Sequence, residues 1–375
     1  MDKPPLVTVL MPVYNGGEYL RLSIESILSQ TYRDFELLII NDCSTDNSLE
    51  TIKSFNDPRI VVYTNTVNMG QTKSLNIGLK LAKGKYIARM DADDMAFPLW
   101  LETLVNYIKE RPENVVVGSA AIVINGVGKI KELRKMPTSF SEIIFHIFYA
   151  PPMNHVSVLF KRDLILESGG YDEEFKITQD YELWSSIIRS NNRIANISDI
   201  LVAYRVHSRS VGFIEANKRG LQEKSETIFR NVNSLTNLKI TRDDAEKICK
   251  LFYHTADLDA AEFLAAQRNF ENIYFNLKEK FNLPPKLIRK GIKTQMLKPY
   301  CKLAIHKIQN KDIKEARRTA LMYYSRYGFH ILPFLIFLTA FTGYRMSAKI
   351  PFIYEKLLET VAKLSLIKNH LKVQT

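Results

Sequence analysis

The sequence predicts an α/β fold: a mostly parallel sheet flanked by helices, followed by a helical C-terminal module. Over the first ~120 residues, apolar strand-like runs alternate with helical segments of about ten to fifteen residues, a pattern typical of βαβ units. Some strand-like runs, such as residues 35–40, are almost entirely apolar, which is expected of strands buried on both faces. From about residue 216 onward the pattern is helical, rich in lysine and without strand alternation.

Strands and helices are expected to alternate through the first third of the chain. The strands are expected at residues 7–14, 35–42, 59–64, 85–91 and 115–124. Apolar residues at helical spacing predict helices at 16–30, 46–55, 72–84 and 98–111. Gly84 suits the end of the third helix, and Pro98 suits the first turn of the fourth. Right-handed connections would place these strands in a parallel sheet.

Residues 125–215 are less regular. The stretch 126–129 (GVGK) is typical of a hairpin turn, and residues 156–165 predict a strand followed by a helix. A further helix is expected at 180–190. The apolar stripe of that helix consists of Leu183, Trp184, Ile187 and Ile188.

The charge of the chain is unevenly distributed. The formal net charge of +12 divides into −3 over residues 1–215 and +15 over residues 216–375. We therefore expect two domains, an α/β domain at 1–215 and a basic helical domain at 216–375 that faces an anionic partner. Because the sequence contains no zinc finger or RNA-binding aromatic motif, an anionic membrane surface is favoured over nucleic acid. A basic helical domain that is simply solvated is the alternative.

Three features bear on the location of the protein. Cys43, Cys249 and Cys301 are far apart and odd in number, which argues for a reducing compartment. The first residues lack a secretory signal pattern, so we expect a cytoplasmic location, at the inner face of the cell membrane. Residues 327–344 are 18 uncharged residues, which is marginal for spanning a hydrocarbon core of ~30 Å. Interfacial attachment, a span or re-entrant hairpin, and a buried core helix all stay open for this segment.

Polar residues follow three of the expected strands. Residues 12–17 (PVYNGG), 41–46 (NDCSTD) and 91–94 (DADD) end the first, second and fourth strands. Ligands of open parallel sheets bind outside the carboxyl ends of the strands, so these residues would meet at one site. There, the carboxylate cluster suits Mg²⁺ or Mn²⁺ with phosphate oxygens, Asp42 suits a base or ribose, and Tyr14 suits stacking on a base. Each stretch alone is also compatible with a turn, a helix cap or a solvated loop.

Two long stretches of the chain resemble a known family. The family 2 glycosyltransferases of the GT-A fold have sequences similar to VTVLMPVYNGGEYLRLSIESILSQTYRDFELLIINDCSTDNS and NMGQTKSLNIGLKLAKGKYIARMDADD. The resemblance covers roughly residues 6–212 and implies a nucleotide-sugar donor, usually a UDP-sugar, with a divalent metal (Mn²⁺ or Mg²⁺) and transfer with inversion. The residues that it places against the nucleotide, its diphosphate or the metal are Pro12, Tyr14, Asp42, Asp91 and Asp93. For Asp94, the roles of ligand and capping residue both stay open.

Two later motifs resemble the same family more loosely. GGYDEEF (169–175) resembles the loop before the catalytic helix, and TQDYELW (178–184) resembles the family's Glu-Asp pair, with Gln179 in place of the glutamate. The resemblance makes Asp180 the expected general base. A carboxylate that takes the proton of the acceptor hydroxyl typically contributes about 10²–10⁴-fold to the rate. A helix N-cap is the alternative role for Asp180.

The segment YRVHSRSVG (204–212) resembles the closing segment of the family. This resemblance implies that His207 reaches the metal or the diphosphate. Arg205 and Arg209 suit an anionic donor because guanidinium groups bind phosphate well. An exposed linker is the alternative for the whole segment.

Three more polar residues are expected near the site. Lys73 and Asn76 begin a helix near the predicted donor cleft, where Lys73 suits a phosphate group. His155 is expected on the acceptor side. A solvated helix face or a core position is the alternative for these residues.

The expected function is that of an inverting glycosyltransferase, either a hexosyl- or an N-acetylhexosaminyl-transferase. It would move a sugar from a nucleotide-sugar donor to a glycan or lipid-linked acceptor, by family analogy in surface-polysaccharide biosynthesis. A sugar-nucleotide pyrophosphorylase would carry a basic, Gly-rich loop after the first strand, but the first basic residue there is Arg21. An aspartyl phosphotransferase would carry its Asp-x-Asp on the first strand, not the fourth. A non-catalytic, membrane-associated protein that binds nucleotide-sugars or glycans is the remaining alternative, although such a protein would usually lose Asp180 or the aspartate cluster.

Overall fold

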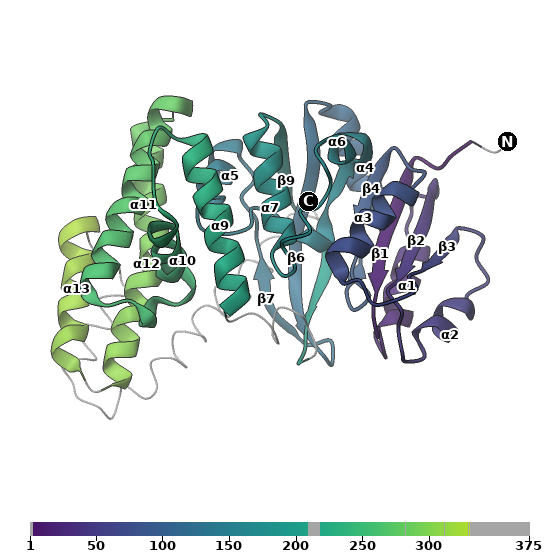
Figure 1. Ribbon diagram of the computed structural model, residues 1–375, viewed down its shortest axis with the longest axis horizontal. Helices are drawn as coiled ribbons and strands as arrows, with labels where there is room; N and C mark the ends of the chain where they lie inside the picture. Colours follow the sequence, from purple (N-terminus) through teal and green to yellow (C-terminus); the bar gives the residue numbers. More distant parts are fainter. Residues whose placement is uncertain (1–2, 209–217, 282, 311, 329, 331–375) are drawn as a thin grey trace, which may run out of the picture. The chain divides into compact units, whose positions relative to one another are not determined.

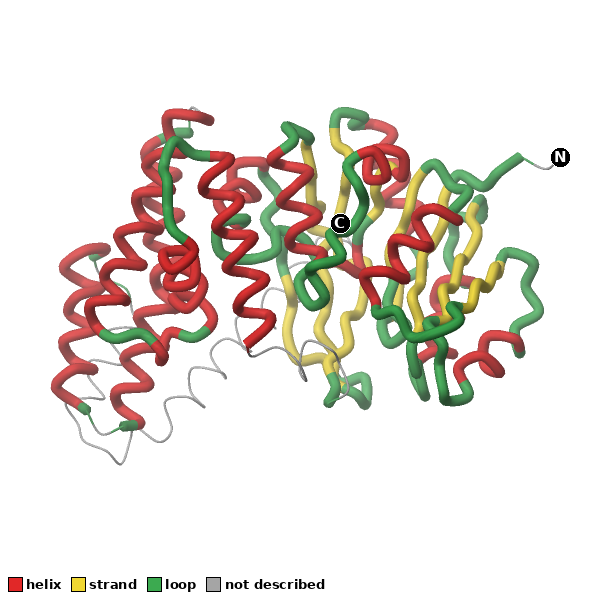
Figure 2. Tube along the Cα trace, viewed as in Figure 1, coloured by secondary structure: helices red, strands yellow, loops and turns green. Residues whose placement is uncertain are grey.

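The computed structural model describes residues 3–208, 218–281, 283–310, 312–328 and 330. The chain divides into two compact units, Met1–Glu223 (the N-terminal unit) and Lys224–Thr375 (the C-terminal unit). The described strands all lie in the N-terminal unit, whereas the described part of the C-terminal unit is helical (Figures 1 and 2). The predicted fold class, a sheet flanked by helices and followed by helices, is therefore confirmed.

The N-terminal unit alternates strands and helices from β1 to β4 and is less regular after that. In order they are β1 (Val7–Val13), α1 (Leu20–Leu28), β2 (Phe35–Asn41), α2 (Ser48–Lys53), β3 (Ile60–Thr64), α3 (Gln71–Leu81), β4 (Tyr86–Arg89), β5 (Met95–Ala96), α4 (Trp100–Glu110), β6 (Asn114–Asn125), β7 (Ile130–Arg134), α5 (Phe140–His146), η1 (His155–Ser157), β8 (Leu159–Lys161), α6 (Arg162–Glu167), α7 (Gln179–Arg189) and β9 (Arg193–Val206). Helix α9 (Lys218–Leu235) begins in this unit and continues into the next.

The strands form one sheet in the order β3-β2-β1-β4-β8-β6-β9-β5, with β7 paired to β6. Strands β3, β2, β1 and β4 run parallel to one another. In their register, Val13 of β1 pairs with Asn41 of β2, and Leu10 of β1 pairs with Arg89 of β4. The carboxyl ends of β1, β2 and β4 therefore lie at the same edge of the sheet, where the polar residues that follow them meet.

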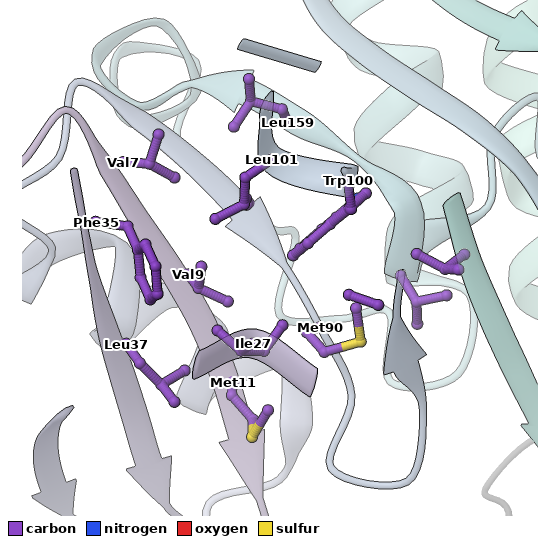
Figure 3. Close-up of a cluster of buried hydrophobic side chains, with 14 of the residues drawn as sticks. Val7, Val9, Met11, Ile27, Phe35, Leu37, Met90, Trp100, Leu101 and Leu159 are labelled. Carbon is purple, nitrogen blue, oxygen red and sulfur yellow. The ribbon is translucent and has the colours of Figure 1, made fainter. Parts of the chain in front are cut away.

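One large hydrophobic cluster of the N-terminal unit lies on one face of this sheet. Alternate residues of β1 and β2 point to the same face because the side-chain period of a strand is two. They form a buried cluster with α1 and α4, which includes the residues labelled in Figure 3: Val7, Val9, Met11, Ile27, Phe35, Leu37, Met90, Trp100, Leu101 and Leu159.

Helix α3 packs closely against β1 and β2. A Cβ atom at Gly78 would lie only 2.2 Å from Cδ1 of Leu10, so glycine at this position allows the close approach. As a result, the first residues of α3 lie near the carboxyl ends of the strands, where the candidate site is found.

Some elements differ from the sequence expectation. Helix α1 begins at Leu20 rather than near residue 16. The preceding residues form a turn in which Asn15 and Gly17 have positive φ angles of 51° and 56°, which a helix does not allow. Strand β7 follows the predicted hairpin turn at 126–129 and pairs antiparallel with β6. Strand β5 and helix α5 have no counterpart in the sequence prediction; β5 has only two residues, too few for a periodic pattern. A capping box at Ser139 and Glu142 starts α5.

The C-terminal unit continues with α10 (Arg242–Tyr253), η2 (Thr255–Asp257), α11 (Ala260–Phe281), α12 (Pro285–Gln309) and α13 (Ile313–Tyr327). Its core is rich in buried aromatic rings, among them Phe263, Phe270, Tyr274, Tyr300 and Tyr323. None of the helices in the described ranges is long and apolar enough to cross a membrane. The uncharged segment 327–344 lies mostly outside the described residues.

Buried polar groups near the amino-terminal ends of β1 and β2 form a hydrogen-bond network. The Thr8 hydroxyl donates to Oε1 of Glu36 (2.6 Å) and accepts from the backbone N–H of Gly84 (2.9 Å). Glu36 Oε1 also accepts from the N–H of Lys83 (2.8 Å). Thr8 is 0% exposed, so water cannot replace these bonds.

We expect Thr8→Val to lower the free energy of unfolding by about 1–3 kcal/mol, because it leaves buried polar groups without a partner. Urea unfolding followed by tryptophan fluorescence measures this, since both tryptophans, Trp100 and Trp184, lie in the N-terminal unit. Thr64→Val makes the same change at an exposed position of β3 and should stay within about 0.5 kcal/mol of the wild type. Equal stabilities of the two variants would contradict the role given to the network.

Candidate active site

Three strand ends converge on the candidate site. The backbone N–H of Asp42, just after β2, donates to the carbonyl of Val13 at the end of β1 (2.8 Å). The N–H of Met90, just after β4, donates to the carbonyl of Leu10 (3.2 Å). The hydrogen bonding of the sheet therefore continues one residue beyond β2 and β4, so Asp42 and Asp91 lie at the same edge of the sheet.

The carboxylates after β4 form a tight cluster. Oxygen atoms of Asp91, Asp93 and Asp94 all lie within 4.8 Å of one another. Burial and the neighbouring charge of Asp91 raise the pKa of Asp93. Burial, together with the charges of Asp93 and Asp91, raises the pKa of Asp94 well above its usual range. Three carboxylates at this spacing stay ionised together only if positive charge is added.

The chain itself supplies one positive charge and two further polar contacts to the cluster. The buried guanidinium of Arg89, on β4, lies with Nη1 2.5 Å from Oδ2 of Asp91. His207, just after β9, places Nε2 2.8 Å from Oδ2 of Asp93. The backbone N–H of Arg205 donates to Oδ1 of Asp94 (2.6 Å). Strand β9 thus brings two residues to the cluster from more than a hundred positions away in the sequence.

The remaining donor set fits a divalent cation. Oδ2 of Asp94 is buried and has no hydrogen-bond partner among the described residues. Mg²⁺ and Mn²⁺ prefer oxygen ligands, and the cluster offers carboxylate oxygens from three residues, with the His207 imidazole beside them. The raised pKa values of Asp93 and Asp94 support the same interpretation. Repulsion between the carboxylates causes part of each shift, and a bound cation would remove that repulsion.

The loop after β2 is built around Asp42, which is only 3% exposed. Its carboxylate accepts hydrogen bonds from Asn65 Nδ2 (2.7 Å) and from the backbone N–H groups of Met69 and Gly70 (2.8 Å each). Asp42 therefore holds the segment that leads into α3.

The two remaining residues predicted to contact the nucleotide lie in and after β1. Pro12 is buried within the strand, whereas the Tyr14 ring is 52% exposed. Of these two residues, only Tyr14 offers an exposed side chain to a ligand.

Asp46 joins the first two strand-end loops. Its carboxylate accepts from the N–H of Gly17 (3.1 Å) and from the N–H of Ser48 (3.0 Å). Burial acts to raise the pKa of Asp46, but the hydrogen bonds from the Ser48 hydroxyl and from these N–H groups outweigh it and lower the pKa overall. Its role is therefore to close the loops, and the N-cap position of α2 belongs to Asn47 rather than to Asp46.

Asp180 is the second residue of α7, and the N-cap position belongs to Thr178. The start of this helix is tied to the aspartate cluster by two amide side chains. Gln179 Nε2 donates to Gln71 Oε1 (2.9 Å), and Gln71 Nε2 donates to Asp91 Oδ1 (3.0 Å). Because Asp91 accepts from the Gln71 amide nitrogen, the Gln71 oxygen is left to accept from Gln179, and both amides are oriented. The expected base, Asp180, is therefore the next residue after Gln179, which is connected to the cluster through Gln71.

Asn76 and His155 contact the segment before α7. The Asn76 amide donates to the carbonyl of Tyr171 (2.9 Å) and accepts from its N–H (2.8 Å). His155 Nε2 lies 2.8 Å from the Tyr171 hydroxyl. Burial, with the charge of Arg89, lowers the pKa of His155 well below its usual value, so this imidazole is neutral. Lys73 lies on the exposed face of α3.

The Arg205 guanidinium is used within the protein. It donates to the carbonyls of Asp93 (2.9 Å), Asn125 (3.2 Å) and Gly126 (3.1 Å), and it stacks 4.5 Å from the centre of the Tyr19 ring. Arg205 therefore braces the cluster backbone rather than presenting its charge to a donor. Arg209 lies outside the described residues.

Sequence reasoning missed Gln71 and Arg89, which both contact Asp91. Arg89 had a signal, since it is a charged residue within an otherwise apolar strand and lies two positions before the cluster. Gln71 had none, because a polar residue at the start of a helix is common. For all the residues predicted from the sequence, the roles toward a ligand stay predictions.

Comparison with known proteins identifies the family. The model of the family described as Glycosyl transferase family 2 matches residues 8–164. A relative in Haemophilus influenzae, described as an uncharacterized glycosyltransferase, is 30% identical over 319 residues, which cover 77% of this chain and 98% of the relative. The chain belongs to glycosyl transferase family 2.

Other relatives from the family carry more specific descriptions. The O-antigen biosynthesis glycosyltransferase WbnJ of Escherichia coli is 36% identical over 214 residues, covering 55% of this chain and 81% of the relative. The amylovoran biosynthesis glycosyltransferase AmsE of Erwinia amylovora is 30% identical over 210 residues, covering 55% and 78%. The protein is accordingly a glycosyltransferase, and the alternatives of a pyrophosphorylase or a non-catalytic binding protein are not supported.

Solved structures with the same fold include two proteins in complex with nucleotide-sugars. TarS of S. aureus in complex with UDP-GlcNAc has 18% identity and a TM-score of 0.53, covering 86% of this chain and 92% of that chain. The mannosyltransferase PcManGT of Pyrobaculum calidifontis in complex with GDP-Man and Mn²⁺ has 16% identity and a TM-score of 0.51, covering 86% and 87%. At this level of identity the similarity shows that the fold is shared.

Proposed function

We propose that the protein is an inverting, metal-dependent glycosyltransferase that takes its sugar from a nucleotide-diphosphate donor. A UDP-sugar is the first candidate, and the sugar is a hexose or an N-acetylhexosamine. The acceptor is a glycan or a lipid-linked sugar in surface-polysaccharide biosynthesis. Relatives described as O-antigen and amylovoran biosynthesis enzymes support the setting, and the UDP-GlcNAc complex of a protein with the same fold supports the donor class.

One observation carries the proposal. A cluster of three carboxylates, which fits a cation, is connected through Gln71 and Gln179 to the start of the helix that bears Asp180. The connection brings together the two requirements of an inverting transfer. One is charge neutralisation at the departing diphosphate, and the other is a base for the acceptor hydroxyl.

The donor side is assigned to the strand-end residues. Asp91 and Asp93, with Asp94 and His207 beside them, would hold Mn²⁺ or Mg²⁺. When bound, this cation supplies positive charge opposite the diphosphate of the leaving group.

Five further residues are assigned to the nucleotide and the donor cleft. The exposed ring of Tyr14 stacks on the base, with Pro12 and Asp42 shaping the wall behind it. Lys73, exposed on α3, is assigned to the donor phosphates, and Asn76 is assigned to the donor cleft through the segment that follows Gly170.

Asp180 is assigned as the general base. Its carboxylate takes the proton from the acceptor hydroxyl as the oxygen attacks the anomeric carbon, and the nucleotide diphosphate leaves from the opposite face. The configuration at the anomeric carbon inverts because bond formation and bond cleavage occur on opposite faces. The half-exposed position of Asp180 at the start of α7 allows contact with a bound acceptor.

A donor screen followed by one substitution tests this assignment. Incubation with UDP-, GDP- and dTDP-sugars, Mn²⁺ and pools of soluble and lipid-linked acceptors should release UDP, and nuclear magnetic resonance of the product should show inversion. Asp180→Asn should then lower kcat by about 10²–10⁴-fold and leave donor affinity within about threefold. Asp163→Asn removes a carboxylate whose side chain is 70% exposed and should keep the wild-type rate. A full rate in Asp180→Asn would contradict the base assignment.

We also propose that residues 1–215 form the catalytic domain and that residues 216–375 form a basic domain that binds the cytoplasmic face of an anionic membrane. The C-terminal helices support this. Helix α12 carries seven Lys and Arg residues and no acidic residue along its 25 positions. Lys286, Arg289 and Lys290 are exposed at its first turns. Basic side chains near an anionic leaflet contribute about 1 kcal/mol each.

Cosedimentation with vesicles tests the membrane proposal. The full chain should bind vesicles that contain anionic lipid and not neutral ones. Replacement of Lys286, Arg289 and Lys290 by glutamine should weaken binding at least about tenfold. The same replacement at Lys80, Lys83 and Lys109, which are exposed in the N-terminal unit, serves as the matched control. Equal binding of neutral and anionic vesicles, or equal loss in both variants, would contradict the proposal.

A further inference from the structure

The segment that leads into α7 is held on one side by α3. The Thr72 hydroxyl donates to the carbonyl of Phe175 (2.8 Å), and the Asn76 amide exchanges two hydrogen bonds with the backbone of Tyr171. Thr72 and Asn76 are both buried. These bonds fix the beginning of the segment, residues 171–175, but not residues 176–178.

Glu223, in the first half of α9, holds the rest of the segment from another element. Its carboxylate accepts from three consecutive backbone N–H groups, those of Lys176 (2.9 Å), Ile177 (2.9 Å) and Thr178 (2.8 Å). The Thr178 hydroxyl (3.2 Å) and Nε of Arg219 (2.9 Å) donate to the same carboxylate. Five donors therefore converge on one side chain that is only 7% exposed.

Two physical requirements at the start of α7 explain this arrangement. Backbone N–H groups before a helix need partners when they are buried, and a negative charge at a helix N-terminus is favoured by the helix dipole. The N-cap residue Thr178 makes no side-chain capping bond to α7 itself. Although burial acts to raise the pKa of Glu223, the hydrogen bonds it accepts lower the pKa overall, so the carboxylate stays ionised. Glu223 thus supplies the charge and the acceptors that the start of α7 lacks.

We propose that Glu223 is a positioning residue for the transfer reaction, which holds residues 176–178 so that Asp180 keeps its place against the acceptor. This inference rests on the proposed role of Asp180 as base. It also extends the proposed catalytic domain beyond residue 215. Glu223 lies beyond residue 215, in a helix that continues into the C-terminal unit, so the base segment is complete only when the start of α9 is present.

Substitution of Glu223 separates positioning from binding. Glu223→Ala should lower kcat about 10–100-fold, because small misplacements of a catalytic group have effects of this size, while donor affinity stays within about threefold. Glu223→Gln keeps one oxygen acceptor and should have a kcat between those of the wild type and the alanine variant. Hydrogen exchange at Ile177 and Thr178, measured by mass spectrometry, should be at least about tenfold faster in Glu223→Ala.

The matched control is Glu226→Gln, one turn further along α9. Glu226 binds Arg230 and Arg242 and has no bond to residues 176–178 among the described contacts. It should keep the wild-type kcat and the wild-type exchange at Ile177. A Glu223→Ala protein with unchanged kcat, with unchanged exchange, or with donor affinity reduced as much as kcat would overturn the inference.

Failure of the base assignment can be recognised separately. If Asp180→Asn keeps its full rate, the proposed base is wrong, whatever Glu223 does. If Asp180→Asn loses its rate and Glu223→Ala does not, the base stands and the positioning role of Glu223 is wrong.

Discussion

Repulsion among the carboxylates after β4 is the constraint on which the rest of the site depends. Asp91, Asp93 and Asp94 lie close together and Asp94 is almost fully buried, so three free anions are not stable there. The chain brings compensation from several elements: Arg89 from within β4, His207 from beyond β9, and the backbone N–H of Arg205. One buried oxygen, Oδ2 of Asp94, stays without a partner among the described residues. The protein thus neutralises only part of the charge, and a divalent cation would complete the balance.

The sheet explains how such a cluster is assembled from distant parts of the chain. Parallel strands β2, β1 and β4 end at one edge, so residues 42 and 91 become neighbours of the loop after β1. The close packing of α3, permitted by Gly78, brings Gln71 within reach of Asp91. From there the Gln179 amide continues the connection to α7. The aspartate cluster and the start of the helix that bears Asp180 are therefore parts of one hydrogen-bonded unit.

The sequence predicted the strands and part of the site, because in both cases a local pattern of residues determines where those residues lie in the fold. Apolar runs predicted the strands, and the rule that ligands bind at carboxyl ends of parallel strands predicted that Asp42 and Asp91 would share an edge. The same reasoning could not find Gln71 or Glu223, because their partners lie 20 to 108 positions away and depend on how helices pack. It also could not show that the Arg205 guanidinium donates its hydrogen bonds to backbone carbonyls. Side-chain bonds between elements are set by tertiary packing, which periodicity does not report.

Binding of Mn²⁺ tests the central interpretation most directly, because it does not require the acceptor to be known. Free Mn²⁺ has a strong electron paramagnetic resonance signal that weakens when the ion is bound by protein. The full chain with UDP present should bind about one Mn²⁺, and Asp93→Asn should weaken that binding at least about tenfold, whereas Asp163→Asn should not. A wild-type chain that leaves the Mn²⁺ signal unchanged, or an Asp93→Asn chain that binds as tightly as the wild type, would contradict the interpretation.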